Sequence, residues 1–338
     1  METISCELCG SDRSLVFFRS RDLLLHLSDD EFSVVRCETC GFLYLNPRPT
    51  PEEISQYYPV EYFSPALPKV RTRLEVLLKK LSRTVKRWIR EDFYGYPSSA
   101  RGFLWRPLRK LALWPEKIRR SLTGRDVIPW ANHGRLLDVG CGPGVNLKTF
   151  QEQGWDVYGI DLSETAVAQA REKVGDRVHC GTLETAPFKD EMFDVVVLNH
   201  SLEHMFSPIK ALEKVWRLLR PGGTAVIAVP NADSLEARLF GSLWIGWDPP
   251  RHLYHFGKTT LTKVLEAAGF RVGELRTALG TYFFMVSFER AWTSNYGGKL
   301  PARKLLEKVI VTPLCLLAGH LGYGTEIKAY AKKPALLT

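Results

Sequence analysis

The sequence contains no apolar stretch that approaches the roughly 18 uncharged residues of a membrane-spanning helix. The best candidate, Val309 to Gly319, is short and is interrupted by Thr312 and Pro313. The first ten residues carry acids and cysteines where a secretory signal has basic and then apolar residues. Apolar residues make up 45% and charged residues 25% of the chain, which excludes disordered and collagen-like classes. We therefore expect a cytoplasmic globular protein.

Disulfides do not suit that compartment, so the seven cysteines need another explanation. Four of them form two matched C-x-x-C-G knuckles, with Gly10 and Gly41 as the glycines, and the metal ligands would be Cys6, Cys9, Cys37 and Cys40. Two-residue spacing lets both sulfurs of a knuckle bind one tetrahedral ion, and redox chemistry needs only one pair. The pattern predicts a structural zinc ion in a small zinc ribbon, with a hairpin between the knuckles (15–18 and 32–36).

The positive charge of the chain is concentrated in one segment. Residues 69–125 hold 17 Lys/Arg and four acids, whereas the rest of the chain holds 29 bases and 33 acids. Within that segment, apolar residues recur at helical spacing from Leu74 to Ile89, and cations occupy the opposite side. A second piece, 103–122, interleaves Trp105 and Trp114 with cations. Such amphipathic basic helices suit an anionic membrane surface, a solvated helix pair packed on the main domain, or nucleic acid.

Three prolines between Pro47 and Pro51 mark a boundary after the cysteine module. We divide the chain into a zinc-ribbon module (1–50), a connector with the basic helical segment (51–125), and a main domain (126–338) with an insertion at 281–325. In the main domain, apolar strands alternate with amphipathic helices. The expected strands are 135–141, 156–161, 177–182, 193–200, 224–230, 270–277 and 326–332, and the expected helices are 145–153, 163–174, 208–219 and 259–268.

This alternation predicts an α/β fold in which a seven-stranded, Rossmann-like sheet has helices on both faces. Ser163 and Ser207 are expected to cap the second and third helices, and Pro208 suits a first turn.

The strongest chemical signal is the segment from Leu136 to Gly144, in which a buried strand runs into three alternate glycines that open a helix. Glycine permits a tight turn and lets the backbone approach a ligand. Asp161, at the end of the next strand, is placed to accept hydrogen bonds from a ribose. The G-x-G-x-G spacing, Pro143 and the negative Asp138 suit pyrophosphate poorly. They suit a ligand with an adenosine, an ammonium group and a positive sulfur.

Residues 130–280 resemble the class I S-adenosylmethionine-dependent methyltransferases. The matching segments are LLDVGCGPG (136–144), VYGIDLS (157–163), GTLETAPF (181–188), MFDVVVLNHSLEHM (192–205), LLRPGG (218–223) and VPN (229–231). The cysteine module with GFLYLNPRPTPEEISQYY (41–58) resembles the zinc-binding region of a bacterial subgroup that acts on sugars, natural-product intermediates and cell-surface glycans.

The resemblance implies which residues bind S-adenosylmethionine. Asp138, Gly140, Gly142 and Gly144 would line its methionine portion. Asp161 would bind the ribose and Leu162 the adenine; Thr182, Leu183 and Glu184 would edge the adenine ring, and Asn199 would lie below the methionyl group. Many relatives have aspartate in place of Thr182, so recognition of the adenine amino group falls to Glu184 or to the backbone.

An alcohol acceptor loses a proton as the methyl group is transferred, which favours a nearby histidine or carboxylate. His200, Glu203 and His204 follow the fourth strand, where open parallel sheets bind their ligands. Glu203-His204 resembles an element of quinone-biosynthesis O-methyltransferases, some of which hold a divalent ion nearby. His204 is the first candidate for the base and His252 the second, and Arg251 is a candidate for binding an anionic acceptor.

The preferred function is O-methylation of a sugar, a lipid-linked glycan or a small-molecule hydroxyl, with peripheral attachment to the inner face of the membrane through residues 69–125. Methylation of tRNA or rRNA is the enzymatic alternative. Against it, Asn199-His200-Ser201-Leu202 stands where amine methyltransferases carry an Asn/Asp-Pro-Pro-aromatic motif. A non-catalytic scaffold that keeps the fold is the third reading.

Overall fold

The computed structural model describes residues 1–59, 73–97, 105–122, 127–131, 133–278 and 280–335. Its larger sheet has seven strands in the order β10-β11-β8-β7-β4-β5-β6. The strands are β4 (Arg135–Val139), β5 (Asp156–Asp161), β6 (Val178–Cys180), β7 (Phe193–Asn199), β8 (Leu219–Pro230), β10 (Arg271–Ala278) and β11 (Glu326–Lys332). Only β11 runs antiparallel to its neighbours. The predicted seven-stranded α/β sheet is confirmed.

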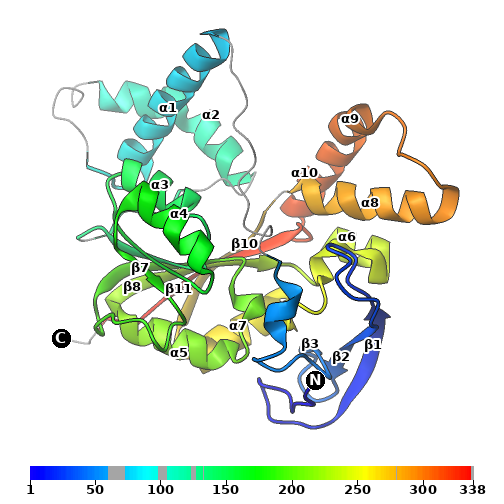
Figure 1. The fold of residues 1–338 in the computed structure, drawn as a ribbon. Helices are drawn as coiled ribbons and strands as arrows, with labels where there is room; N and C mark the ends of the chain where they lie inside the picture. The colour runs from blue at the N-terminus through cyan, green and yellow to red at the C-terminus, as the bar shows by residue number, and fades with distance from the viewer. Residues whose placement is uncertain (60–72, 98–104, 123–126, 132, 279, 336–338) are drawn as a thin grey trace.

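Helices cover both faces of this sheet (Figure 1). One face carries α3 (Val145–Glu152) and α4 (Glu164–Val174), and the other carries α5 (Pro208–Leu218) and α7 (Lys258–Ala267). Neighbouring residues of one strand belong to different cores, because successive side chains point to opposite faces. Leu136 lies in the core beside α3 and α4, whereas Leu137 lies in the core beside α5 and α7.

The element boundaries follow the sequence pattern closely. Strands β5 and β11 have the predicted limits, and β8 begins at Leu219 instead of residue 224. The Ser163 hydroxyl caps α4 by accepting a hydrogen bond from the Ala166 amide at 3.2 Å. Ser207 precedes α5 without a side-chain cap, since its hydroxyl donates to the carboxylate of Glu7 in the cysteine module.

The cysteine module contributes a second, antiparallel sheet. It consists of β1 (Ser14–Ser20), β2 (Phe32–Cys37), β3 (Leu43–Leu45) and β9 (Tyr254–His255), in that order. The predicted hairpin is therefore present as β1 and β2. Strand β9 comes from a distant part of the chain, so the module shares a sheet with a segment that follows β8. A short 3-10 helix, η1 (Ile54–Tyr57), follows the module.

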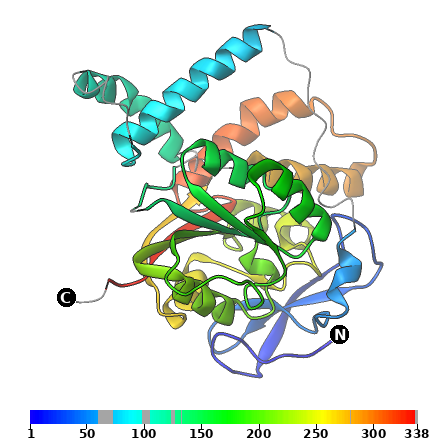
Figure 2. The same cartoon turned by 60° about the vertical axis from the view of Figure 1, so that its left-hand side comes forward.

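The basic segment forms two helices, α1 (Arg73–Phe93) and α2 (Arg106–Leu122), as predicted. They lie above α3, away from the cysteine module (Figures 1 and 2). Arg106 and Arg109 of α2 pair with the buried Asp92 carboxylate at the end of α1, at 3.0 and 2.7 Å. Residues 60–72, 98–104 and 123–126 of the connector and basic segment, and the α1 side chains up to residue 81, lie outside the described structure.

Shorter elements complete the chain. Between β7 and β10 lie η4 (Leu202–His204), α6 (Leu235–Phe240), η5 (Gly241–Leu243) and η6 (Ile245–Trp247). The 281–325 insertion forms α8 (Thr281–Tyr296), α9 (Arg303–Leu306), the π-helical turn η7 (Glu307–Val311) and α10 (Thr312–His320). Among the described helices, none combines the length and the hydropathy that spanning a bilayer demands.

Candidate functional site

The glycine turn lies at the carboxyl end of β4 and makes close contacts that exclude larger residues. Gly140, Gly142 and Gly144 have φ values of 74°, 51° and 74°. A Cβ atom on Gly140 would lie 2.8 Å from the Cβ of Ser201, and one on Gly144 would lie 2.8 Å from Ala170 of α4. A Cβ on Gly142 would meet nothing within 4 Å. The turn is therefore packed on its inner side and open at its tip.

Asp161, the last residue of β5, holds this turn in place. Its carboxylate accepts hydrogen bonds from the Gly142 amide at 2.7 Å and from the Ser163 amide at 2.9 Å. Leu162 follows it with 72% of its surface exposed, although it is a large apolar residue. A carboxylate beside an exposed leucine offers acceptors for ribose hydroxyls and an apolar face for a base. Both features match the roles that the sequence predicts for these two residues.

Asp138 is the clearest indication of a ligand-binding site. It is buried in β4, and neither carboxylate oxygen has a hydrogen-bond partner in the described structure. Burial, with some repulsion from Asp161, raises the pKa of Asp138 to about 7. A buried polar group without a partner is costly, so a ligand that brings positive charge or donors to this point is favoured. The ammonium and sulfonium groups of S-adenosylmethionine fit that requirement.

The remaining residues of the predicted cofactor site lie at the same edge of the sheet. Thr182 is engaged in its own turn, because its amide donates to the Thr185 hydroxyl at 2.9 Å and its hydroxyl accepts from the Thr185 amide at 3.3 Å. Leu183 is buried and Glu184 is exposed. Asn199 ends β7 with an exposed side chain at the carboxyl edge of the sheet. Of the adenine-edge residues, only Glu184 keeps both exposure and a charge.

The three histidines among the catalytic candidates lie around the fourth candidate, the buried carboxylate of Glu203. Its Oε1 atom lies 3.3 Å from His200 Nδ1 and 4.0 Å from His252 Nε2, and its Oε2 atom has no hydrogen-bond partner in the described structure. The rings of His204 and His252 meet edge to face at 4.7 Å. The contribution of His200 outweighs burial and lowers the pKa of Glu203 to about 2. Glu203 is therefore a carboxylate at neutral pH.

The three histidines differ in charge. His200 is held by Glu203 and by Glu326, whose Oε2 lies 2.7 Å from His200 Nε2. Against the opposing effect of burial, these two carboxylates raise the pKa of His200 to about 10, so its ring is an imidazolium at neutral pH. Burial lowers the pKa of His204 to about 4 and also lowers that of His252. These two rings are neutral.

Backbone contacts define which nitrogen of each neutral ring is basic. His204 Nδ1 lies 3.0 Å from the Arg251 carbonyl, and His252 Nδ1 lies 2.9 Å from the Gly246 carbonyl. Because a carbonyl oxygen only accepts, both Nδ1 atoms carry the proton and both Nε2 atoms carry the lone pair. The Tyr58 hydroxyl, 2.9 Å from His204 Nδ1, adds a second acceptor for the same proton. Ligand atoms of Glu203, His204 and His252 also lie within 4.8 Å of one another, close enough for a shared cation.

Arg251 does not have the role expected for it. Its side chain is completely buried, and its guanidinium group donates to Asp22 at 2.6 and 3.0 Å and to Asp248 at 2.5 and 3.0 Å. The expectation that Arg251 binds an anionic acceptor is wrong, because two carboxylates of the protein already occupy its donors. Arg251 instead joins the cysteine module, through Asp22, to the segment that carries His252.

The four predicted zinc ligands come together in the cysteine module. The Sγ atoms of Cys6 and Cys40, and those of Cys9 and Cys37, lie 3.5 Å apart, and no disulfide joins them. Zn–S bonds of about 2.3 Å in a tetrahedron give S···S edges of about 3.8 Å. Gly10 and Gly41 have φ values of 73° and 76° and close each knuckle by donating to the carbonyls of Cys6 and Cys37. The donor set and its geometry fit one closed zinc site.

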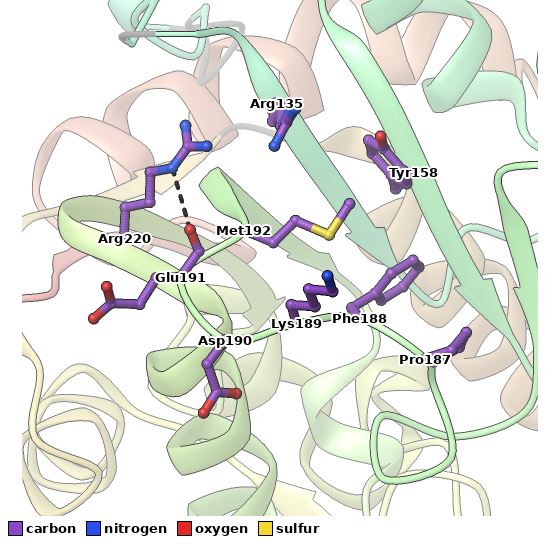
Figure 3. A pocket seen from close by; sticks show the side chains of 9 residues that line it. All are labelled: Arg135, Tyr158, Pro187, Phe188, Lys189, Asp190, Glu191, Met192 and Arg220. Atoms are coloured by element: carbon purple, nitrogen blue, oxygen red, sulfur yellow. Dashed lines mark hydrogen bonds between the residues drawn. The ribbon is translucent and has the colours of Figure 1, made fainter.

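A hollow of about 550 Å³ lies at the opposite edge of the large sheet (Figure 3). It is lined by residues at the starts of β4 and β7, including Arg135, Met192 and Arg220, and Arg220 Nε donates to the Glu191 carbonyl at 3.1 Å. In open parallel sheets, ligands bind outside the carboxyl ends of the strands. This hollow lies at the amino ends, so we do not assign it to catalysis.

Comparisons with known proteins place the chain among methyltransferases. A family model described as a methyltransferase domain matches residues 106–275. A probable S-adenosylmethionine-dependent methyltransferase of Mycolicibacterium smegmatis is 29% identical over 161 residues, which cover 46% of this chain and 56% of that protein. A ubiquinone biosynthesis O-methyltransferase of Parvibaculum lavamentivorans is 30% identical over 168 residues, which cover 46% and 65%.

Other relatives differ in the atom that they methylate. A malonyl-acyl-carrier-protein O-methyltransferase of Enterobacter lignolyticus is 33% identical over 131 residues, covering 38% of this chain and 51% of that protein. A ubiquinone/menaquinone biosynthesis C-methyltransferase of Geobacter sulfurreducens is 34% identical over 127 residues, covering 35% and 49%. The chain thus spans about half to two thirds of the length of these four relatives. A solved methyltransferase from Thermotoga maritima covers 68% of this chain and 96% of its own, with 19% identity and a TM-score of 0.44.

Proposed function

Because the chain belongs to the methyltransferase-domain family, we propose that it transfers a methyl group from S-adenosylmethionine to a hydroxyl of a small molecule, most specifically of a sugar or a lipid-linked glycan. The observation that carries the proposal is the partnerless carboxylate of Asp138 beneath the open glycine turn, with Asp161 one strand away. This arrangement supports a cationic nucleoside as the ligand. Two of the relatives are O-methyltransferases by name, which supports oxygen as the atom methylated.

The cofactor, when bound, supplies an electrophilic methyl group on a sulfonium. The protein's own contribution would be to orient the cofactor and to neutralise its charge. Asp138 would balance its positive end, and Asp161 would accept hydrogen bonds from its ribose. Methyl transfer is an in-line displacement, so holding the acceptor oxygen opposite the sulfur provides much of the rate. The acceptor then belongs at the carboxyl edge beside Asn199 and His200, where the polar side chains of β7 and β11 meet.

We assign the removal of the acceptor proton to His204, with His252 as the reserve candidate. Both rings are neutral and present a basic Nε2, whereas His200 is already protonated at neutral pH. Glu203 would stabilise the imidazolium that forms, since its carboxylate is buried and ionised. His200 would hold Glu203 and Glu326 in place and add positive charge near the acceptor oxygen.

A peripheral membrane location on the cytoplasmic side remains part of the proposal, and α2 supports it. Four large apolar side chains of α2 and one directly before it have 42–70% of their surface exposed: Leu108, Leu111, Trp114 and Ile118 in the helix, and Trp105 before it. Exposed apolar residues flanked by cations such as Lys110 and Lys117 suit an anionic lipid surface. A protein attached in this way meets lipid-linked acceptors directly.

Substitution of Asp161 is expected to weaken cofactor binding. The variant D161N keeps the shape of the side chain but loses the charge, and D161A loses both. Since hydrogen bonds to a charged group contribute about 1.5–3 kcal/mol, affinity for S-adenosylhomocysteine should fall about 10- to 100-fold. Isothermal calorimetry on the full chain measures this, with D156A on the same strand as the matched control. Unchanged binding in D161A, or no binding by the wild type, would contradict the proposed site.

Substitution of His204 is expected to reduce turnover and leave cofactor affinity unchanged. Removing a general base lowers rates about 100-fold or more, so H204A should lose methyl transfer while the exposed-histidine control H133A keeps it. The assay uses tritiated S-adenosylmethionine with three acceptor pools: butanol-extracted lipid-linked sugars, water-soluble nucleotide sugars and total tRNA. With S-adenosylmethionine at a saturating concentration, so that protonation of Asp138 near pH 7 does not limit cofactor binding, the rate should fall as His204 protonates near pH 4. Label found only in tRNA would identify RNA, and not a sugar, as the acceptor. Full activity of H204A would show that His204 is not the base.

A further inference from the structure

A second hollow, distinct from the cofactor site, lies between the basic helices and the large sheet. It has a volume of about 890 Å³, within the range of ligand pockets. Its roof is formed by α1 and α2, its side wall by α3 and residues 127–128, and its floor by β7, β8 and β11. Figure 2 shows the two roof helices standing over α3. The floor is apolar under the centre, where Val197, Val226 and Ala228 lie side by side on paired strands.

Cations from three separate elements line this hollow. Lys86 and Arg90 come from α1, one turn apart, Arg120 comes from α2, and Lys328 comes from β11. Among the described residues that line it, Glu116 is the single acid, and its carboxylate pairs with Arg120 at 2.9 Å. Burial lowers the pKa of Arg90, and the neighbouring Arg120 and Arg87 lower it further, against attraction from Tyr96 and Glu91. A cavity lined by charges of one sign raises the local concentration of the opposite ion, so this hollow attracts anions.

The hollow does not coincide with the cofactor site. The glycines of the turn, Asp161 and Leu162 do not line it, and Asn199 is the one predicted cofactor residue that does. Asn199 ends β7 at the point where the methyl group is expected. A molecule bound in the hollow therefore reaches the methyl-transfer point past Asn199, and its charged part rests among the cations under the helices.

We propose that this hollow binds the diphosphate group of the methyl acceptor. The inference rests on the proposed function and names its substrate class: a hydroxylated molecule joined to a diphosphate. Two oxyanion groups match the cations of Lys86, Arg90 and Lys328 around an apolar floor, with Arg120 beside them in its pair with Glu116. The exposed side chain of Asn146 offers a further donor. The carrier beyond the diphosphate is either an isoprenoid lipid or a nucleotide. The exposed apolar face of α2 favours the lipid.

The test is a binding titration of the full-length protein that needs no turnover. Inorganic pyrophosphate is the first probe, and micellar farnesyl diphosphate and UDP-glucose are the second and third. The variant K86Q/K328Q removes two cations of the hollow, and K210Q/K263Q removes two exposed cations from α5 and α7, on the other face of the sheet. We expect pyrophosphate to bind the wild type, K86Q/K328Q to lose at least 10-fold in affinity, and K210Q/K263Q to bind as the wild type does. Binding of S-adenosylhomocysteine should be equal in all three proteins.

The outcomes separate this inference from the proposed function. If K210Q/K263Q weakens pyrophosphate binding as much as K86Q/K328Q, the attraction is diffuse and the site does not exist. Normal binding of S-adenosylhomocysteine without any binding of the three probes overturns the diphosphate site and leaves the methyltransferase intact. Tighter binding of farnesyl diphosphate than of UDP-glucose supports a lipid carrier, and the reverse order supports a nucleotide carrier.

Discussion

Replacing Arg251 by methionine is expected to lower the free energy of unfolding by about 3–5 kcal/mol. Arg251 lies between two buried carboxylates, and its removal leaves Asp22 and Asp248 close together without their common partner. An uncompensated buried charge costs more than the pair contributes when intact. Urea unfolding of the purified protein, followed by tryptophan fluorescence, measures the change. It should affect the cysteine module and the 245–256 segment together, since Arg251 joins them.

The triple variant D22N/R251M/D248N is the control for charge. With no ions left in the site, most of the lost stability should return, because similar volumes pack without a desolvation cost. The sign of the pH dependence follows from the pKa of Asp22. Burial raises this pKa, but Arg251 lowers it by more, from 3.8 to about 2. The stability that the Asp22–Arg251 ion pair contributes is therefore complete above about pH 4 and is lost as the pH falls toward 2. If the free energy of unfolding of R251M lies within about 1 kcal/mol of the wild-type value, the ion pairs of Arg251 with Asp22 and Asp248 make no net contribution to stability.

The ion pair between Arg251 and Asp22 shows what could not be predicted from the sequence. The central strands β4 and β7 could be placed from the sequence because they are buried on both faces and read as apolar runs. Spacing predicted the cluster of four cysteines, because a knuckle is a local structure that its own residues determine. The role of Arg251 could not be predicted in this way. A cation after two prolines looks exposed, and its partner Asp22 lies 229 positions away in the sequence. No local pattern marks an isolated aspartate in a loop as an ion-pair partner.

The protonation states of the histidines also could not be predicted from the sequence. His200 and His204 are four residues apart and look equivalent in the sequence, yet one has a raised and the other a lowered pKa. The difference comes from the carboxylates of Glu203 and of Glu326, which β11 brings to His200 from the far end of the chain. The buried His204 ring instead has the Tyr58 hydroxyl and the Arg251 carbonyl as its partners. Strand β9 was also missed, because two residues are too short to show a period. The clustering of the four cysteines was predictable from their spacing, whereas the charges of the histidines depend on tertiary neighbours.

Loss of zinc is expected to destabilise more than the cysteine module. The variant C9S removes one ligand from an exposed position, so it creates no cavity. Structural zinc contributes about 10–16 kcal/mol in zinc-finger peptides, and each kcal/mol corresponds to roughly 2–4 °C in a domain of 150–250 residues. We expect the melting temperature of C9S to fall by at least about 10 °C and its zinc content to drop from one ion per chain. C180S, which removes a thiol outside the cluster, should retain both.

Coupling between the zinc site and Arg251 follows from the way β3 and β9 share a sheet. If the cysteine module unfolds without zinc, Asp22 leaves Arg251 and β9 loses its partner strand. The cost of R251M should then be smaller in the C9S background than in the wild type, and a double-mutant cycle measures the difference. Additive effects would mean that Asp22 stays paired with Arg251 when the zinc site is lost. Strong non-additivity would mean that the zinc ion, through Asp22 and Arg251, helps to hold His252 and His204 at the methyl-transfer edge.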